Sequence, residues 1–90
     1  MERAHRIFPN TLRLHRKMMG YSQRQVASLL GLHDAAPVSL WEKGAILPST
    51  VNLIQLSLLY RTYPNELYDD VFHTFRERLK VKELELFKSE

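Results

Sequence analysis

The chain of 90 residues contains no cysteine, only three glycines and no long apolar run. Without cysteine, neither disulfides nor thiolate zinc sites can form, so the packing of side chains has to stabilise the fold. A reducing cytoplasm is the expected location. No stretch reaches the roughly 20 apolar residues of a membrane span, and the first residues lack the hydrophobic segment of a signal peptide. The length suits one domain with one modest core, and we expect it to be soluble, without membrane association.

Residue types that build catalytic and metal sites are present, but their spacing does not suit either role. The four histidines share no metal-ligand spacing, and no H-x-x-x-H or E-x-x-H motif adjoins the isolated acidic pair Asp69-Asp70. The serines have no plausible base and orienting group, and the chain has neither a phosphate-binding loop nor a dinucleotide fingerprint. The sequence therefore predicts no enzyme activity, no metal and no cofactor.

The net charge of +3 is unevenly distributed. Residues 1–47 hold seven Lys or Arg against three acidic residues, whereas the remainder holds six against seven. A basic N-terminal half suits a polyanion such as DNA, because neutralised phosphates release condensed counterions. A solvated basic face would give the same composition, so charge alone does not decide between them.

Glycines, prolines and capping residues divide the chain into segments with helical spacing, and no segment has a strong β pattern. Helices are expected at about residues 11–19, from Ser22 to the glycine at 31, from 34–37 to 43, at 50–60 and at 63–67. Capping is expected from Asn10, from a Ser22 and Gln25 capping box, and from Ser49. In the fourth helix the residues expected to face inward are Leu53, Leu56 and Tyr60. Three further apolar residues are expected to widen this face: Ile54, Leu58 and Leu59.

The pattern changes after residue 68. Val71, Phe72, Phe75 and Leu79 lie on one helical face. Residues 81–87 fit a strand or a helix by period, and a helix is favoured because Lys, Glu and Leu propagate helices well. The apolar face either folds back on the preceding helices or pairs with a second subunit. We therefore expect a domain at residues 1–68 and a C-terminal helical extension at 69–90 that is a possible dimerisation segment.

Three segments stand in an informative order: YSQRQVASLLGL at 21–32, VSLWEKG at 38–44, and Pro48-Ser49 before an apolar helix. Together they resemble the Xre/Cro-like, phage-repressor-type helix-turn-helix DNA-binding family, over about residues 10–68. The resemblance implies an all-α, five-helix repressor-like domain with a central helix-turn-helix. It also implies a structural ion pair between Arg16 and Glu42, which would tie the first helix to the end of the third.

The resemblance further implies that the third helix enters the major groove of double-stranded DNA. The base-facing positions would be Ala35, Ala36, Pro37, Ser39 and Leu40. Gln23 would contact a phosphate at the start of the second helix. Apart from the resemblance, the basic residues best placed for further phosphate contacts are Arg24, Lys43 and Arg13, and a solvated surface role stays open for each. An arm containing Arg3 and Arg6 would reach the backbone or the minor groove.

These features predict a transcriptional regulator, by default a repressor that binds operator DNA as a homodimer, since two-fold dimers read paired half-sites. The alternative is an antitoxin-like or degenerate module that acts mainly by binding another protein. Two departures from the family pattern favour it, the nonpolar residues at 35–37 and the apolar loop at 45–47. The chain also has one residue more between Gly31 and Val38 than family members usually have.

Overall fold

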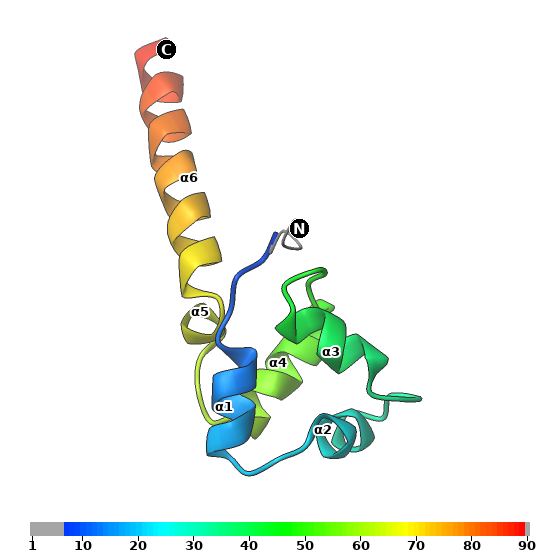
Figure 1. The fold of residues 1–90 in the computed structure, drawn as a ribbon. Helices are drawn as coiled ribbons and strands as arrows, with labels where there is room; N and C mark the ends of the chain where they lie inside the picture. Colours follow the sequence, from blue (N-terminus) through cyan, green and yellow to red (C-terminus); the bar gives the residue numbers. More distant parts are fainter. Residues whose placement is uncertain (1–6, 90) are drawn as a thin grey trace, which may run out of the picture.

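The computed structural model describes residues 7–89, and in these residues every regular element is a helix. Five short helices form a compact body and a long sixth helix projects from it (Figure 1). The helices are α1 (Leu12–Met18), α2 (Gln23–Leu29), α3 (Ala36–Glu42), α4 (Thr50–Leu59), α5 (Pro64–Leu67) and α6 (Asp69–Ser89). We call residues 12–67 the body. The all-α class is confirmed, and so is the helical form of residues 81–87.

Capping side chains fix where α2 and α4 begin. Ser22 and Gln25 form the expected capping box, with Ser22 Oγ accepting from Gln25 N at 3.0 Å and Gln25 Oε1 accepting from Ser22 N at 2.8 Å. Ser49 caps α4 through the N–H of Asn52. The Asp34 carboxylate accepts a hydrogen bond from the N–H of Ala36 at 2.8 Å. Helix α3 begins at Ala36, although the following proline disfavours helical geometry at that residue.

Four helices end in the same way, with a residue in the left-handed conformation just after the last helical turn. At α1, α2 and α3 this residue is glycine, with φ of +80, +74 and +75 degrees, and at α4 it is Arg61 with φ of +55 degrees. At α2, the N–H of Leu32 reaches the carbonyl of Ala27 and the N–H of Gly31 reaches that of Ser28, which is the Schellman pattern. The left-handed residue after each of these helices lets the chain change direction sharply where the helix ends.

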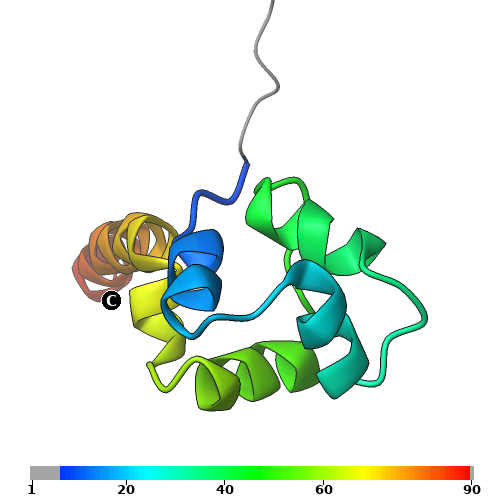
Figure 2. The ribbon, with the colours of Figure 1, turned by 60° about the horizontal axis from the view of Figure 1, so that its bottom comes forward.

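One apolar core joins the five short helices. Its buried members come from every helix of the body and from the residues just after α4 and α5: Leu12, Val26, Ala27, Val38, Trp41, Leu56, Tyr60, Leu67 and Tyr68. Figure 2 shows α1 and α2 on either side of the chain segment that links them, with α4 running beneath both. The N–H of Thr11 bonds the carbonyl of Leu67 at 2.9 Å, so the two ends of the body meet.

Two expectations for the body were wrong in detail. Ile54 and Leu58 do not widen the inward face of α4, because they are 50% and 72% exposed. In a helix with this many apolar residues, spacing alone does not say which side is buried. Helix α1 begins at Leu12 rather than 11, and Asn10 Oδ1 accepts from the N–H of Leu12 without being the residue that immediately precedes the helix.

Helix α6 differs from the rest, because none of its described residues is buried. Val71 packs partly against the core, but the face that follows it is open, with Phe72, Phe75 and Leu79 at 39%, 45% and 63% exposure. The apolar face of α6 therefore does not fold back on the body beyond its first turn.

Candidate nucleic-acid interface

Helices α2 and α3 pack against each other across the turn at 30–35, in the order of a helix-turn-helix. Ala27, which is 2% exposed, allows close approach, and the left-handed Gly31 makes the turn out of α2. Val38 and Trp41 seat the inner face of α3 in the core. The outer side of α3 and the first turn of α2 are left at the surface.

A buried ion pair joins α1 to the end of α3. Arg16 Nε donates to Glu42 Oε2 at 2.6 Å and its second terminal nitrogen donates to Oε1 at 3.1 Å, so the contact is bidentate. Both residues are only 8% exposed. The hydrogen bond to Glu42 raises the pKa of Arg16 above its ordinary value, and burial acts in the opposite direction. Removing either partner would leave the other as an uncompensated buried charge.

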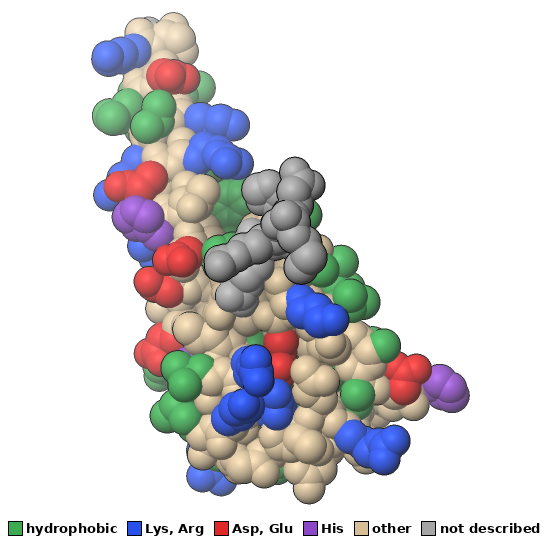
Figure 3. Space-filling view, in the orientation of Figure 1, with side chains coloured by type: hydrophobic (Ala, Val, Ile, Leu, Met, Phe, Trp, Pro, Cys, Tyr) green, Lys and Arg blue, Asp and Glu red, His purple; other side chains and the backbone are tan. Residues whose placement is uncertain are grey.

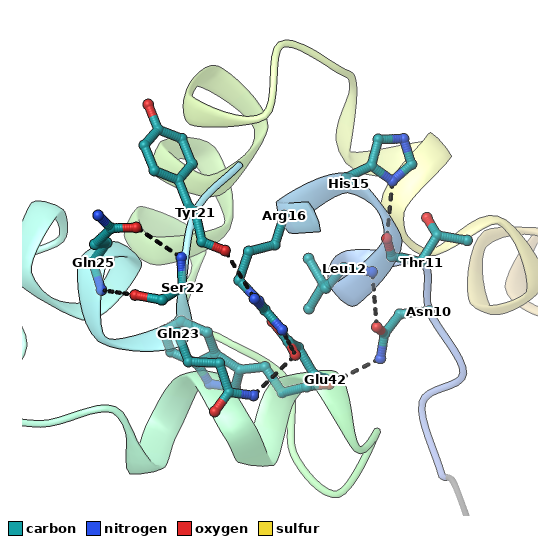
Figure 4. A network of polar contacts seen from close by, with 11 residues as sticks. Asn10, Thr11, Leu12, His15, Arg16, Tyr21, Ser22, Gln23, Gln25 and Glu42 are labelled. Atoms are coloured by element: carbon teal, nitrogen blue, oxygen red, sulfur yellow. Dashed lines mark hydrogen bonds and ion pairs between the residues drawn. The ribbon is translucent and has the colours of Figure 1, made fainter. Parts of the chain in front are cut away.

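This pair is the centre of a larger polar network (Figure 4). Arg16 also donates to the carbonyl of Tyr21 at 2.8 Å, and Gln23 Nε2 donates to Glu42 Oε1 at 3.0 Å. Asn10 Nδ2 donates to the carbonyl of Trp41 at 2.8 Å. The network therefore fixes the start of α1, the start of α2 and the end of α3 relative to one another.

Two of these contacts were not predicted from the sequence. Gln23 was expected to bind phosphate, but one of its amide N–H groups is already used by Glu42. Asn10 was expected to be a helix cap only, yet it also bridges to α3 across 31 residues. Neither contact has a local sequence signal, because each depends on how two distant helices meet.

An open hollow of about 720 Å³ lies between α1, the start of α2 and α3. Four of the predicted DNA-contacting residues line it together: Arg13, Gln23, Ser39 and Lys43. Arg16 and Glu42 also line it. The hollow thus has three basic side chains and one acidic one, and the acidic one is already paired with Arg16.

Figure 3 looks onto this surface of the molecule. Lys and Arg side chains lie over α1, α2 and α3 and also along α6, while the acidic side chains on this face lie mostly along α6 and the neighbouring edge of the body. An anion that approaches α1–α3 therefore meets a positive surface.

The other predicted contact residues lie outside this hollow. Arg24 and Ala35 line a separate hollow of about 330 Å³ beside the turn between α2 and α3. Ala36 and Leu40 are exposed on α3 and Pro37 is half-buried. Ala35 is half-buried and packs partly against the core, which leaves it less surface for a base contact than expected. Arg3 and Arg6 lie outside the described residues.

The Helix-turn-helix family model matches residues 12–67, which is more than half of the chain and coincides with the body. The chain belongs to the Xre/Cro-like helix-turn-helix family. This is a family of DNA-binding transcriptional regulators, not typically of enzymes. No curated protein and no solved structure matches the chain.

Membership of the Xre/Cro-like family agrees with the geometry described above. The matched region contains α1–α5 and the Arg16–Glu42 pair with Tyr21 and Gln23, while Asn10 of the same network lies just before it, and it ends two residues before α6 begins. No helix within residues 7–89 is both long and apolar enough to cross a membrane. Among the same residues, no group of three or more His, Asp or Glu side chains is placed to hold a metal ion.

Proposed function

We propose that this protein is a sequence-specific transcriptional repressor that binds operator DNA as a homodimer and blocks transcription by occupying its site. The observation that carries the proposal is the hollow between α1, α2 and α3, where Arg13, Gln23, Ser39 and Lys43 come together from three separate helices. A surface that combines helix-borne cations with a helix start suits the backbone of duplex DNA.

In this proposal α3 lies in the major groove. Ala36, Pro37, Ser39 and Leu40 face base edges, with Ala35 at the margin. Small apolar groups contact thymine methyls, and the shape of the DNA adds specificity where hydrogen-bond donors are few. Arg13, Arg24 and Lys43 contact phosphates, together with the N–H group of Gln23 that Glu42 does not use.

The Arg16–Glu42 pair has a positioning role. It contacts no DNA base itself, but it holds the hollow's three walls at fixed distances. Because the pair and the core set the geometry before DNA arrives, binding costs little conformational entropy in the body.

The test is selection of genomic DNA fragments by the purified full chain, with sequencing of the retained fragments. A repressor retains fragments that share a motif, and its affinity falls steeply with salt. Sequence-blind, salt-labile retention would contradict the proposal and favour the protein-binding alternative, which would use the exposed Ile46 and Leu47 of the loop after α3.

Variants sharpen this test. Lys43→Ala should weaken binding to every sequence alike and reduce the salt dependence by about one phosphate contact. Lys88→Ala removes the same charge from α6 and is the matched control, with binding to single half-sites unchanged. Leu40→Ala should instead change which bases are preferred, so equal losses on all sequences would show that α3 does not face the bases.

A further inference from the structure

The long helix α6 leaves an apolar surface that the chain itself does not cover. A groove of about 470 Å³ lies between the base of α6 and the body, with six apolar side chains among its walls: Leu47, Leu53, Val71, Phe72, Phe75 and Leu79. Further along the same face of α6, Leu86 is 56% exposed. Such a contiguous apolar surface on a chain of this size marks a site for a partner.

The spacing on α6 fits a helical partner. Phe72, Phe75, Leu79, Lys82 and Leu86 repeat at alternating steps of three and four residues, which is the seam of a coiled coil. Four of these five positions are apolar. The seam therefore needs a second helix with the same periodicity, and α6 of another copy has it.

Charges flank this seam in a segregated order. Arg76 and Glu83 lie along one side of it, and Arg78 and Glu85 lie along the other. On both sides the arginine is nearer the start of α6 and the glutamate is nearer the end. Within residues 7–89 the ion pairs are Arg16–Glu42 and Lys80–Glu77, so none of these four flanking residues is in an ion pair there.

We propose that α6 pairs antiparallel with α6 of a second copy. In this direction Arg76 of each copy meets Glu83 of the other and Arg78 meets Glu85, which gives four attractive pairs. A parallel arrangement would give only two, between Arg78 and Glu83, and would set Lys82 against Lys82 in the seam. Antiparallel pairing sets Lys82 against Leu79, so the like charges stay apart.

The same register identifies what occupies the groove. Leu86 of the second copy lies opposite Phe75, so the end of each α6 covers the apolar groove at the base of the other. The two positions of Asp69 then lie about 35 Å apart along the pair, at 1.5 Å of rise per residue. This separates the two bodies by about one turn of DNA, the spacing of paired half-sites.

Disulfide trapping tests the direction, and the absence of cysteine from the natural chain makes the readout clean. Full-length Phe75→Cys and Leu86→Cys variants are mixed, oxidised and weighed by mass spectrometry. Antiparallel pairing predicts mainly the mixed disulfide, because position 75 of one copy lies close to position 86 of the other. Two identical positions in the pair lie far apart. Mainly self-linked products would show parallel pairing, and no disulfide would show that α6 does not pair; either result overturns the proposal.

Charge reversal tests the flanking pairs by light scattering. The double variant Arg76→Glu with Arg78→Glu should dimerise at least tenfold more weakly than the natural chain, and so should Glu83→Arg with Glu85→Arg. An equal mixture of the two should regain dimer formation. Lys80→Glu with Lys88→Glu changes net charge by the same amount away from the seam, and an equal loss in that variant would contradict the assigned pairs.

This inference rests on the proposed dimer, but its failure is separable from failure of the repressor proposal. If the chain is monomeric and still enriches a DNA motif, only the α6 pairing is wrong. If the mixed disulfide forms and DNA retention is sequence-blind, the pairing stands and the repressor proposal is wrong.

Discussion

The body and α6 treat their apolar side chains in opposite ways. The five short helices of the body bury a shared core, and they pair the buried charges of Arg16 and Glu42 inside it. Helix α6 has 21 residues, twice the length of α4, and buries none of them. The core is therefore built from the five short helices together with Tyr68, whereas beyond Val71 the apolar residues of α6 become buried only when another chain covers them.

The largest expected difference between the two regions concerns their glutamates. Glu42→Ala should lower the free energy of unfolding by about 3–5 kcal/mol, because Arg16 would remain as a buried unpaired charge. Glu77→Ala removes the glutamate of the exposed Lys80 pair and should cost less than about 1 kcal/mol. Urea denaturation measures both values. Replacing the pair as Arg16→Met with Glu42→Leu should recover most of the loss, and a double variant no better than Glu42→Ala would argue against the uncompensated charge as the cause.

Leucine truncations draw the same contrast in the core. Leu56 is 1% exposed and Leu84 is 64% exposed. Leu56→Ala should destabilise the body by about 2–5 kcal/mol through lost burial and a residual cavity. Leu84 lies outside the proposed seam, so Leu84→Ala should change the free energy of unfolding by no more than about 0.5 kcal/mol. Thermal unfolding of both variants checks this, and comparable losses would mean that α6 is packed far more tightly than its exposure indicates.

Alkaline pH should destabilise the body through a buried tyrosine. Burial raises the pKa of Tyr68 to about 12 from an ordinary value of 10.0. Between these values the unfolded chain loses the phenol proton while the folded chain keeps it, so stability falls as pH rises, by up to about 3 kcal/mol. Unfolding followed against pH should show this fall, and Tyr68→Phe should reduce it. Tyr63→Phe alters an exposed ring and is the control; an identical pH profile for all three proteins would contradict the assignment.

The smallest expected effect is a gain in stability at the end of α4. Arg61 adopts φ of +55 degrees, where glycine ends the three preceding helices. Arg61→Gly should stabilise the body by about 0.5–1 kcal/mol, because relief of left-handed strain exceeds the extra entropy of glycine in the unfolded chain. The melting temperature should rise by a few degrees. Arg61→Ala keeps the left-handed strain, so its melting temperature should not rise. If it rises as much as that of Arg61→Gly, the gain in stability comes from removing the guanidinium and not from relief of strain.

Local features of the fold could be predicted because their causes are local. Ser22, Gln25 and Ser49 cap backbone groups within three residues of themselves, and the three glycines end helices by their own conformational freedom. The Arg16–Glu42 pair joins distant residues, yet the family resemblance implied it, and the structure contains it.

Features that depend on how helices meet could not be predicted. The bonds from Gln23 to Glu42 and from Asn10 to Trp41 each need a particular approach of two elements, which periodicity does not encode. Similarly, Ile54 and Leu58 suit a buried face by composition and are exposed because α4 offers more apolar residues than the core can take. The gathering of Arg13, Gln23, Ser39 and Lys43 around one hollow also follows from tertiary packing.

The hydrogen bond between Thr11 and Leu67 brings the two ends of the body together. Ile7, Phe8 and Pro9 line a hollow with the first turns of α6, and Figure 1 shows both segments leaving the body on the same side. The two chain segments that connect the body to other parts of the protein therefore lie close together at its surface. A longer leader before residue 7 or a different helix after Val71 could be attached at neighbouring points while Phe8, Asn10 and Tyr68 keep their contacts with the five short helices, so evolution or a protein engineer can change both attachments on one side of the body.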